Sequence, residues 1–165
     1  NLEKFRAPIS ELQERFANAG KIQPEIAIFG EKDLQQLLIL KKMVTDLDLN
    51  IDILRVPTFR APDGLALSSR NKYLSKSQRE LAPRVWQTIE ACMQNLSCAT
   101  ENDTSAIVKA AQTKLEIAGF TVDYLELREL AMLKPVQNLS QDCALFVAAR
   151  IGDTRLIDNI MMPGR

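Results

Sequence analysis

Two hydroxyl side chains and a guanidinium stand together in the middle of the chain, at Ser68, Ser69 and Arg70. They follow a Pro-Asp-Gly sequence at residues 62–64, which is typical of a turn. Small hydroxyls and main-chain N–H groups can surround phosphate oxygens, and the planar fork of arginine neutralises their charge. This stretch therefore predicts an anion-binding loop, with a polyphosphate as the favoured ligand. The alternative for so short a motif is a polar surface turn with solvated charges.

A second candidate stretch, Gly30-Glu31-Lys32-Asp33, lies between an apolar run at residues 26–29 and a helical pattern. Helix N-termini attract anions, and ligands of open α/β sheets bind beyond the carboxyl ends of the strands. This arrangement would place Lys32 where a phosphate could meet it. Taken alone, Lys32 and Asp33 are better explained as an ordinary solvated first turn, with Asp33 complementing the helix dipole.

These residues need strands and helices that position them. The run at residues 25–29 is apolar on both faces, as expected of a buried parallel strand, and a second strand is predicted over residues 51–56. Between them a helix extends to about Asp46, with an apolar stripe at Leu37, Leu40, Val44 and Leu47. A helical crossover makes the two strands parallel, so their carboxyl ends meet at the same edge of the sheet. The two candidate loops, which follow these strands, should therefore open on the same side of the sheet.

The second half of the chain predicts helices first. Ser75 and Gln78 form a capping-box pattern, and Pro83 interrupts the helix. A second helix with its own apolar stripe follows, in which Trp86 is expected to anchor the core. The stripe consists of Val85, Trp86, Ile89, Met93 and Leu96. A polar linker is predicted from Ser97 to Asp103. A further helix starts at Asp103 or Thr104 and ends at Gly119.

Three antiparallel strands complete the pattern, at residues 122–127, 144–151 and 154–160. In the first, Val122 and Tyr124 should share one face, and Asp123 and Leu125 the other. Gly152-Asp153 predicts the tight turn between the last two. The charged residues of this hairpin are expected to form a solvated or paired surface set without a catalytic role; they are Arg150, Arg155 and Asp158.

Composition narrows the class of protein. The 165 residues carry 21 basic and 21 acidic side chains, which removes the electrostatic case for nucleic acid or an anionic membrane as a partner. Three cysteines without a Cys-x-x-Cys pair, and no histidine, predict free cytosolic thiols and no metal site. A membrane span needs about 18 consecutive apolar residues, and no run in this sequence approaches that length. The first 20 residues carry charges throughout, unlike a signal peptide. A cytoplasmic location is therefore expected.

Several motifs, in this order and spacing, together carry a specific resemblance. They are Phe29-Gly30-Glu31-Lys32-Asp33 with Gln35-Gln36, Val56-Pro57-Thr58, the stretch from Asp63 to Asn71, Tyr73-Leu74, Val147-Ala148-Ala149-Arg150, and Arg155-Leu156-Ile157-Asp158-Asn159. From about residue 23 to 160 the chain resembles the pantothenate synthetases (pantoate–β-alanine ligases) of the nucleotidyltransferase superfamily.

The resemblance implies an α/β fold in two parts. Residues 1–60 would be a remnant of a Rossmann-like nucleotidyltransferase parallel sheet, and residues 61–165 a small C-terminal α+β lid domain with an antiparallel sheet. Residues 1–22, with a helix predicted from Pro8 to about Ala19, look like the extreme N-terminal helix of the family. A large central segment of the N-terminal domain would then be absent from this chain.

The resemblance also implies a reaction. The family uses ATP and Mg²⁺ to convert pantoate to pantoyl adenylate, and the amine of β-alanine then displaces AMP to give pantothenate. By likeness, Gly30, Glu31, Lys32 and Asp33 would contact ATP, Gln36 would bind pantoate, and the Phe59 backbone would line the adenine pocket. Leu67, Ser68, Ser69 and Arg70 would close over the triphosphate. The catalytic set would be Lys32, Ser68, Ser69 and Arg70, with no protein metal ligand.

One departure from the family bears on activity. Its members carry a histidine-containing ATP signature and a pantoate-binding glutamine in their first half, whereas this chain has no histidine. We therefore expect an incomplete enzyme; the alternative is a catalytically silent domain that binds nucleotide or a partner. A homodimer would form through the missing segment, and some relatives continue beyond the position of Arg165 into a cytidylate kinase domain.

Overall fold

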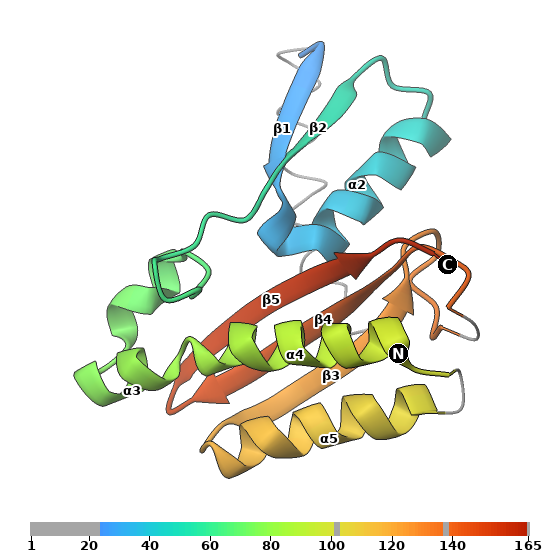
Figure 1. Ribbon diagram of the computed structural model, residues 1–165. Helices are drawn as coiled ribbons and strands as arrows, with labels where there is room; N and C mark the ends of the chain where they lie inside the picture. Colours follow the sequence, from blue (N-terminus) through green and yellow to red (C-terminus); the bar gives the residue numbers. More distant parts are fainter. Residues whose placement is uncertain (1–23, 101–102, 137–138, 165) are drawn as a thin grey trace. The chain divides into compact units, whose positions relative to one another are not determined.

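The computed structural model describes residues 24–100, 103–136 and 139–164 (Figure 1). The chain divides into two compact units, one up to Pro57 and the other from Thr58, and each is described by itself. The helix predicted from Pro8 to Ala19 lies outside the described residues. The assignment of residues 1–60 to nucleotide binding and of 61–165 to a lid stays a prediction.

The first unit is a parallel β-α-β arrangement. Strand β1 (Ile26–Gly30) leads through a short 3₁₀ turn, η2 (Glu31–Asp33), into helix α2 (Leu34–Asp46), and β2 (Asp52–Val56) follows. The two strands pair in parallel, with Gly30 opposite Val56. Their carboxyl ends therefore meet at one edge, which confirms the predicted helical crossover.

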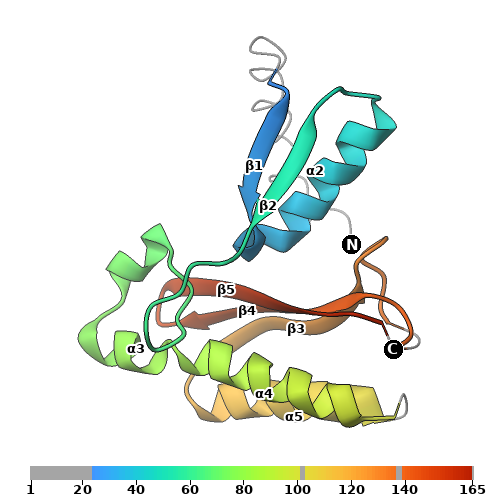
Figure 2. The ribbon, with the colours of Figure 1, turned by 45° about the horizontal axis from the view of Figure 1, so that its top comes forward.

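Two details of the first unit differ from the sequence prediction. Strand β1 is not buried on both faces, since Ile26 is 53% and Ile28 65% exposed. The physical reason is that the described sheet has only two strands, with α2 packed on one face (Figure 2). Helix α2 buries Leu34, Leu37, Leu40 and Val44, but Leu47 is 61% exposed because the helix ends one residue earlier, at Asp46.

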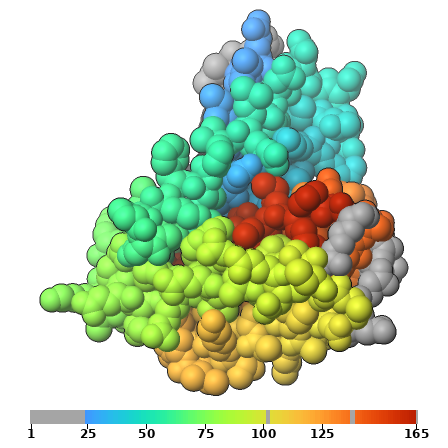
Figure 3. All heavy atoms as spheres, viewed as in Figure 1, coloured from blue at the N-terminus to red at the C-terminus, as the bar shows by residue number. Residues whose placement is uncertain are grey.

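The second unit packs two helices on a three-stranded sheet. After η3 (Ser69–Tyr73) come α3 (Lys76–Leu81), α4 (Arg84–Cys98), α5 (Thr104–Ile117), β3 (Thr121–Glu129), β4 (Cys143–Ile151) and β5 (Thr154–Met162). The strands are antiparallel in the order β3-β4-β5, as predicted. Helices α4 and α5 form the outer layer over one face of this sheet (Figures 1 and 3).

The helix starts follow the local sequence chemistry. The predicted capping box is present, because Gln78 N donates to Ser75 Oγ at 3.3 Å and Ser75 N donates to Gln78 Oε1 at 2.9 Å. Pro83 stands at the N-cap of α4, which extends to Cys98, into the predicted linker. Asp103 occupies the N-cap position of α5 but its side chain does not cap the helix.

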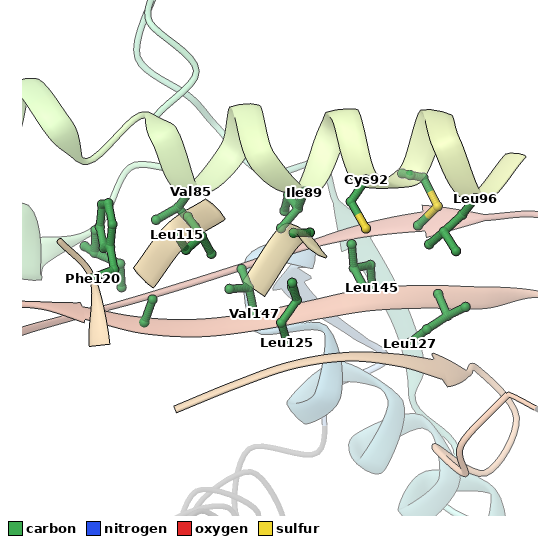
Figure 4. Close-up of a cluster of buried hydrophobic side chains, with 14 of the residues drawn as sticks. Val85, Ile89, Cys92, Leu96, Leu115, Phe120, Leu125, Leu127, Leu145 and Val147 are labelled. Atoms are coloured by element: carbon green, nitrogen blue, oxygen red, sulfur yellow. The ribbon is translucent and has the colours of Figure 1, made fainter. Parts of the chain in front are cut away.

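The core of the second unit lies between these helices and the central strand β4. Residues 143–149 are all buried, and alternate side chains of this strand meet α4 and α5 side chains in one cluster, among them Leu145 and Val147 (Figure 4). Members from the helices include Val85, Ile89, Leu96 and Leu115. Trp86 is partly buried and packs against this cluster, so it contributes to the core, as predicted, without being fully enclosed in it.

A β-bulge changes which side chains of β3 face the helices. Val122 pairs with Ala149 and Tyr124 with Ala148, so Asp123 is an extra residue in the strand. Beyond the bulge, Leu125 and Leu127 join Val122 on the helix-covered face. The predicted grouping of Val122 with Tyr124 is therefore wrong, because a one-residue insertion shifts the two-residue alternation.

Candidate nucleotide-binding loops

The first candidate loop begins where β1 ends, at Gly30. This glycine has an ordinary extended backbone (φ −76°, ψ 139°), and a Cβ added to it would meet nothing within 4 Å. Neither backbone strain nor packing within the described residues explains the glycine. A glycine in that situation suits a position where a ligand approaches the main chain closely.

Glu31 holds this loop against the neighbouring strand. Its carboxylate Oε1 lies 3.2 Å from Arg55 Nε on β2, and the Glu31 side chain is only 17% exposed. This ion pair joins the start of η2 to strand β2. The Glu31 carboxylate thus has a structural partner, and its contact with ATP stays a prediction.

The remaining residues of the first loop lie at the start of α2. Lys32 is partly buried and Asp33 is exposed in η2, and Gln36 is partly buried in the first turn of α2. Within the described residues the Asp33 side chain stands at the N-cap position of α2 but makes no capping hydrogen bond. The structure brings Gly30, Lys32, Asp33 and Gln36 together at the carboxyl end of β1, as an anion site requires.

The second candidate loop is a narrow hairpin within the second unit. Leu67 N donates to Phe59 O at 2.8 Å, Ala61 N donates to Leu65 O at 2.8 Å, and Arg60 forms an antiparallel bridge with Ala66. The side chains of Phe59 and Leu67 are 74% and 54% exposed. The structure therefore places these two predicted site residues beside each other, at the open end of the hairpin.

Ser68, Ser69 and Arg70 follow directly, at the start of η3. The Ser68 hydroxyl accepts a 3.3 Å hydrogen bond from Arg70 N, so it caps this short turn. Ser69 and Arg70 are exposed. The predicted cluster of two hydroxyls and a guanidinium is thus present on one tight turn, with the arginine side chain accessible to an anion.

The hairpin is held by residues that the sequence analysis did not assign to the site. Arg60 donates from Nη1 to Asp158 Oδ2 at 2.6 Å and from Nη2 to Asp158 Oδ1 at 2.9 Å. Its guanidinium also lies 3.4 Å from the centroid of the Trp86 ring. Asp158, which was expected at the surface, has a side chain only 4% exposed. That expectation is wrong because Asp158 faces the helices and is paired with Arg60.

Gly64 and Asn71 hold the two remaining parts of the loop. Gly64 has a φ of +92°, and an added Cβ would lie 2.6 Å from Trp86 Cδ1. Asn71 Nδ2 donates to Ala66 O at 3.0 Å, which ties η3 to the hairpin. Both residues belong to the predicted Asp63–Asn71 motif, where the turn signal at Gly64 was readable and the Asn71 contact was not.

Charges elsewhere in the second unit form surface pairs, as predicted. Asp123, the bulge residue, lies 2.7 Å from Arg155 Nε and 3.4 Å from Arg150 Nε. The hydrogen bond from Arg155 holds the pKa of the Asp123 carboxyl below its ordinary value. Similarly, the Arg79 hydrogen bond lowers the pKa of Asp63. In the described part of the chain, no three His, Cys, Asp or Glu residues are grouped to hold a metal ion.

These features define the class of the protein. It is an α/β protein whose parallel strands end at a glycine loop before a helix, followed by an α+β unit that presents a Ser-Ser-Arg turn, as the sequence predicted. The profile of the family Pantoate-beta-alanine ligase matches residues 19–161. The chain belongs to this family.

Individual relatives agree with this assignment. The chain is 48% identical over 139 residues to a pantothenate synthetase of Pseudomonas savastanoi pv. phaseolicola, a match that covers 84% of this chain and 49% of the relative. A relative from Acinetobacter baylyi is 45% identical over 141 residues, covering 86% and 49% of the two chains. The chain thus spans about half the length of the curated relatives it matches.

Solved structures give the same assignment. The pantothenate synthetase of Thermus thermophilus superposes with a TM-score of 0.80 at 36% identity, covering 87% of this chain and 52% of that one. The pantoate-beta-alanine ligase of Francisella tularensis, solved in complex with beta-gamma ATP and beta-alanine, has a TM-score of 0.58 at 29% identity, covering 87% and 46%. Every helix in the described residues is too short or too polar to cross a membrane.

Proposed function

We propose that the full-length protein condenses pantoate with β-alanine to give pantothenate, at the expense of ATP and through a pantoyl-adenylate intermediate. The observation that carries this proposal is the family match over residues 19–161, which includes both candidate loops. The Francisella tularensis relative in complex with beta-gamma ATP and beta-alanine supports the use of the same nucleotide and amine here.

The chemistry needs charge stabilisation rather than a protein nucleophile. A carboxylate oxygen of pantoate attacks the α-phosphorus of ATP, and pyrophosphate leaves. The amine of β-alanine then attacks the acyl carbon of the adenylate, loses a proton, and AMP leaves. Both steps are accelerated by donors already aimed at the charge that develops on the leaving group.

The first loop supplies part of these donors. Lys32 meets the phosphates at the uncapped start of α2, and Asp33 reaches toward the ribose. Gly30 and Glu31 contact ATP along the loop, where Gly30 leaves the main chain uncovered. Gln36, in the first turn of α2, binds pantoate.

The second loop supplies the rest. The Phe59 backbone lines the adenine pocket, and Leu67, Ser68, Ser69 and Arg70 close over the triphosphate. The exposure of Ser69 and Arg70 on the η3 turn supports this role. The residues from 61 onward form the lid that carries this loop to the nucleotide.

Mg²⁺ fits this arrangement as an ion bound mainly by the substrate. The described residues offer no cluster of carboxylates for a dedicated site, and Mg²⁺ is commonly held by substrate phosphates, water and few protein ligands. When bound, it neutralises charge on the triphosphate. Lys32 and Arg70 would supply the remaining positive charge to the same phosphates.

We also propose that these 165 residues are an incomplete enzyme. Two observations support this: the chain spans about half of its relatives, and it has no histidine for the ATP signature of the family. Alone, it would bind nucleotide without efficient turnover, and the subunit contact would come from residues outside it.

Replacement of Arg70 tests the proposed site. In the full-length protein, Arg70→Ala should lower kcat/KM for ATP on the order of 100-fold, as expected for loss of a donor to transition-state charge. Its thermal midpoint should not change, because the side chain is exposed. Lys72→Ala, which removes an exposed cation two residues away, is the matched control and should retain the rate. Equal rates of pyrophosphate release in wild type and Arg70→Ala would remove Arg70 from this role.

A further inference from the structure

A buried ion pair joins the second candidate loop to strand β5. The side chain of Asp158 is 4% exposed and that of Arg60 20%, and two hydrogen bonds join them. Asp158 lies on β5 opposite Val147, whose side chain belongs to the core. The carboxylate thus stands among apolar neighbours, where an unpaired charge would be strongly unfavourable.

Arg60 has further contacts that orient its guanidinium. One face lies 3.4 Å from the Trp86 ring centroid, and Nη1 also donates to Gly64 O at 3.1 Å. Asp158 Oδ1 additionally accepts from Asn159 N at 2.9 Å. A planar fork with a stacked face and a bidentate partner has one orientation, which lysine cannot reproduce.

This fixed side chain lies next to a pair of exposed side chains in the hairpin, those of Phe59 and Leu67. Arg60 is the hairpin residue directly after Phe59, and its bridge partner Ala66 directly precedes Leu67. Ala66 is buried, whereas Phe59 and Leu67 point outward. The alternation means that holding Arg60 and Ala66 inward sets the direction of Phe59 and Leu67, and the start of the Ser68–Arg70 turn.

Stability alone does not explain an ion pair at this place. Replacing a buried pair by apolar residues of similar volume is often neutral or stabilising, because both charges must be desolvated. A pair with defined geometry does fix one arrangement of the segments it joins. Here the pair joins the hairpin to the middle of β5, which pairs with β4. These two are the most buried strands of the described second unit.

We propose that Arg60 and Asp158 are positioning residues for the nucleotide: their pairing, stacked on Trp86, holds the main chain of Phe59 and Leu67 where it contacts ATP. They act through the hairpin and do not touch the substrate. This role rests on the proposed ligase function, since it requires ATP to bind at this loop. A displacement of about 1 Å can cost on the order of 100-fold in rate even when the altered residue is remote from the chemistry.

Arg60→Lys in the full-length protein is the test. It keeps the charge for Asp158 but loses the fork and the stacked plane. Below the thermal midpoint, with folding checked by circular dichroism, kcat/KM for ATP in pyrophosphate release should fall at least about tenfold. KM for β-alanine should not change. Arg155→Lys, in the exposed pair with Asp123 on the same sheet, is the control and should keep the wild-type rate.

Amide hydrogen exchange separates this inference from the proposed function. The Ala61 and Leu67 amides, which donate within the hairpin, should exchange faster in Arg60→Lys, while β4 amides keep their protection. Wild-type exchange at both amides, or an equal rate loss in Arg155→Lys, would overturn the proposal. If wild type releases no pyrophosphate, the ligase proposal fails and the nucleotide-positioning role fails with it; faster exchange would then show only that the pair holds the hairpin. If Arg60→Lys does not fold, Asp158→Asn gives the same readouts.

Discussion

Gly64 offers a sharp test of how the second loop is built. Its φ of +92° is a conformation that L side chains rarely adopt, and an added Cβ would lie 2.6 Å from Trp86 Cδ1. Left-handed backbone costs about 1–2 kcal/mol for a residue with a Cβ. Overpacking against a fixed side chain typically adds about 1–3 kcal/mol. The indole cannot easily yield, because Arg60 is stacked on it.

Gly119 provides a matched control, since it has the same φ of +92° but an added Cβ would meet nothing within 4 Å. Gly119→Ala should therefore lower the free energy of unfolding by about 1 kcal/mol, which reflects backbone strain less the reduced entropy of the unfolded chain. Gly64→Ala should lower it by about 3 kcal/mol, because the steric overlap is added.

Urea unfolding of both variants measures this difference. Trp86 is the only tryptophan of these 165 residues, so its fluorescence reports directly on the site of the clash. The emission of folded Gly64→Ala should shift, and that of Gly119→Ala should not. Equal losses of stability with unchanged emission in both variants would refute the packing of Gly64 against Trp86.

Three further outcomes are expected. Ser75→Ala removes the side-chain acceptor of the capping box at α3, so the free energy of unfolding measured in urea should fall by about 1 kcal/mol. A loss below about 0.3 kcal/mol would show that the cap does not support the fold. The pKa of Asp123 is held below its ordinary value by Arg155, so this pair stabilises the protein above about pH 4 and loses its effect as pH falls through the lower folded pKa. The stability difference between wild type and Asp123→Asn should therefore shrink between about pH 6 and about pH 2, and a constant difference would contradict the pairing. Burial raises the pKa of the Cys92 thiol to about 11, so brief alkylation of the native protein at about pH 8 should modify exposed Cys98 and spare Cys92, as checked by mass spectrometry; equal modification would contradict the core packing.

Much of the fold was predictable because its signals are local. The capping box at Ser75, the break at Pro83 and the turn at Gly152 depend on neighbouring residues, and the structure contains each of them. The parallel crossover between β1 and β2 was predictable in the same way, because it follows from the periodicity of two short strands and the helix between them.

The predictions that failed concern features that depend on residues distant in the sequence. A bulge at Asp123 depends on the register with β4, which no sequence pattern around it reveals. Asp158 looked like a surface charge because its partner, Arg60, is 98 residues away in the chain. The exposure of Ile28 depends on how many strands surround β1, and that is a property of the sheet rather than of the strand.

For the candidate site, the motifs pointed to two segments, and the structure shows which contacts hold these segments in place. The exposed Ser69 and Arg70 were recognisable by residue type, whereas the pair that holds their loop was not. Side chains that contact a ligand carry a chemical signature in the sequence. Those that position the loop look like ordinary charged residues until their partners are known.

Pyrophosphate release by the full-length protein, with ATP, Mg²⁺ and β-alanine present and pantoate added or omitted, tests the proposed function most directly. We expect release that depends on pantoate and is accompanied by an equal amount of pantothenate. The isolated 165 residues should bind ATP in calorimetry without comparable turnover. Absence of pantoate-dependent release from the full-length protein would contradict the ligase function proposed for this chain.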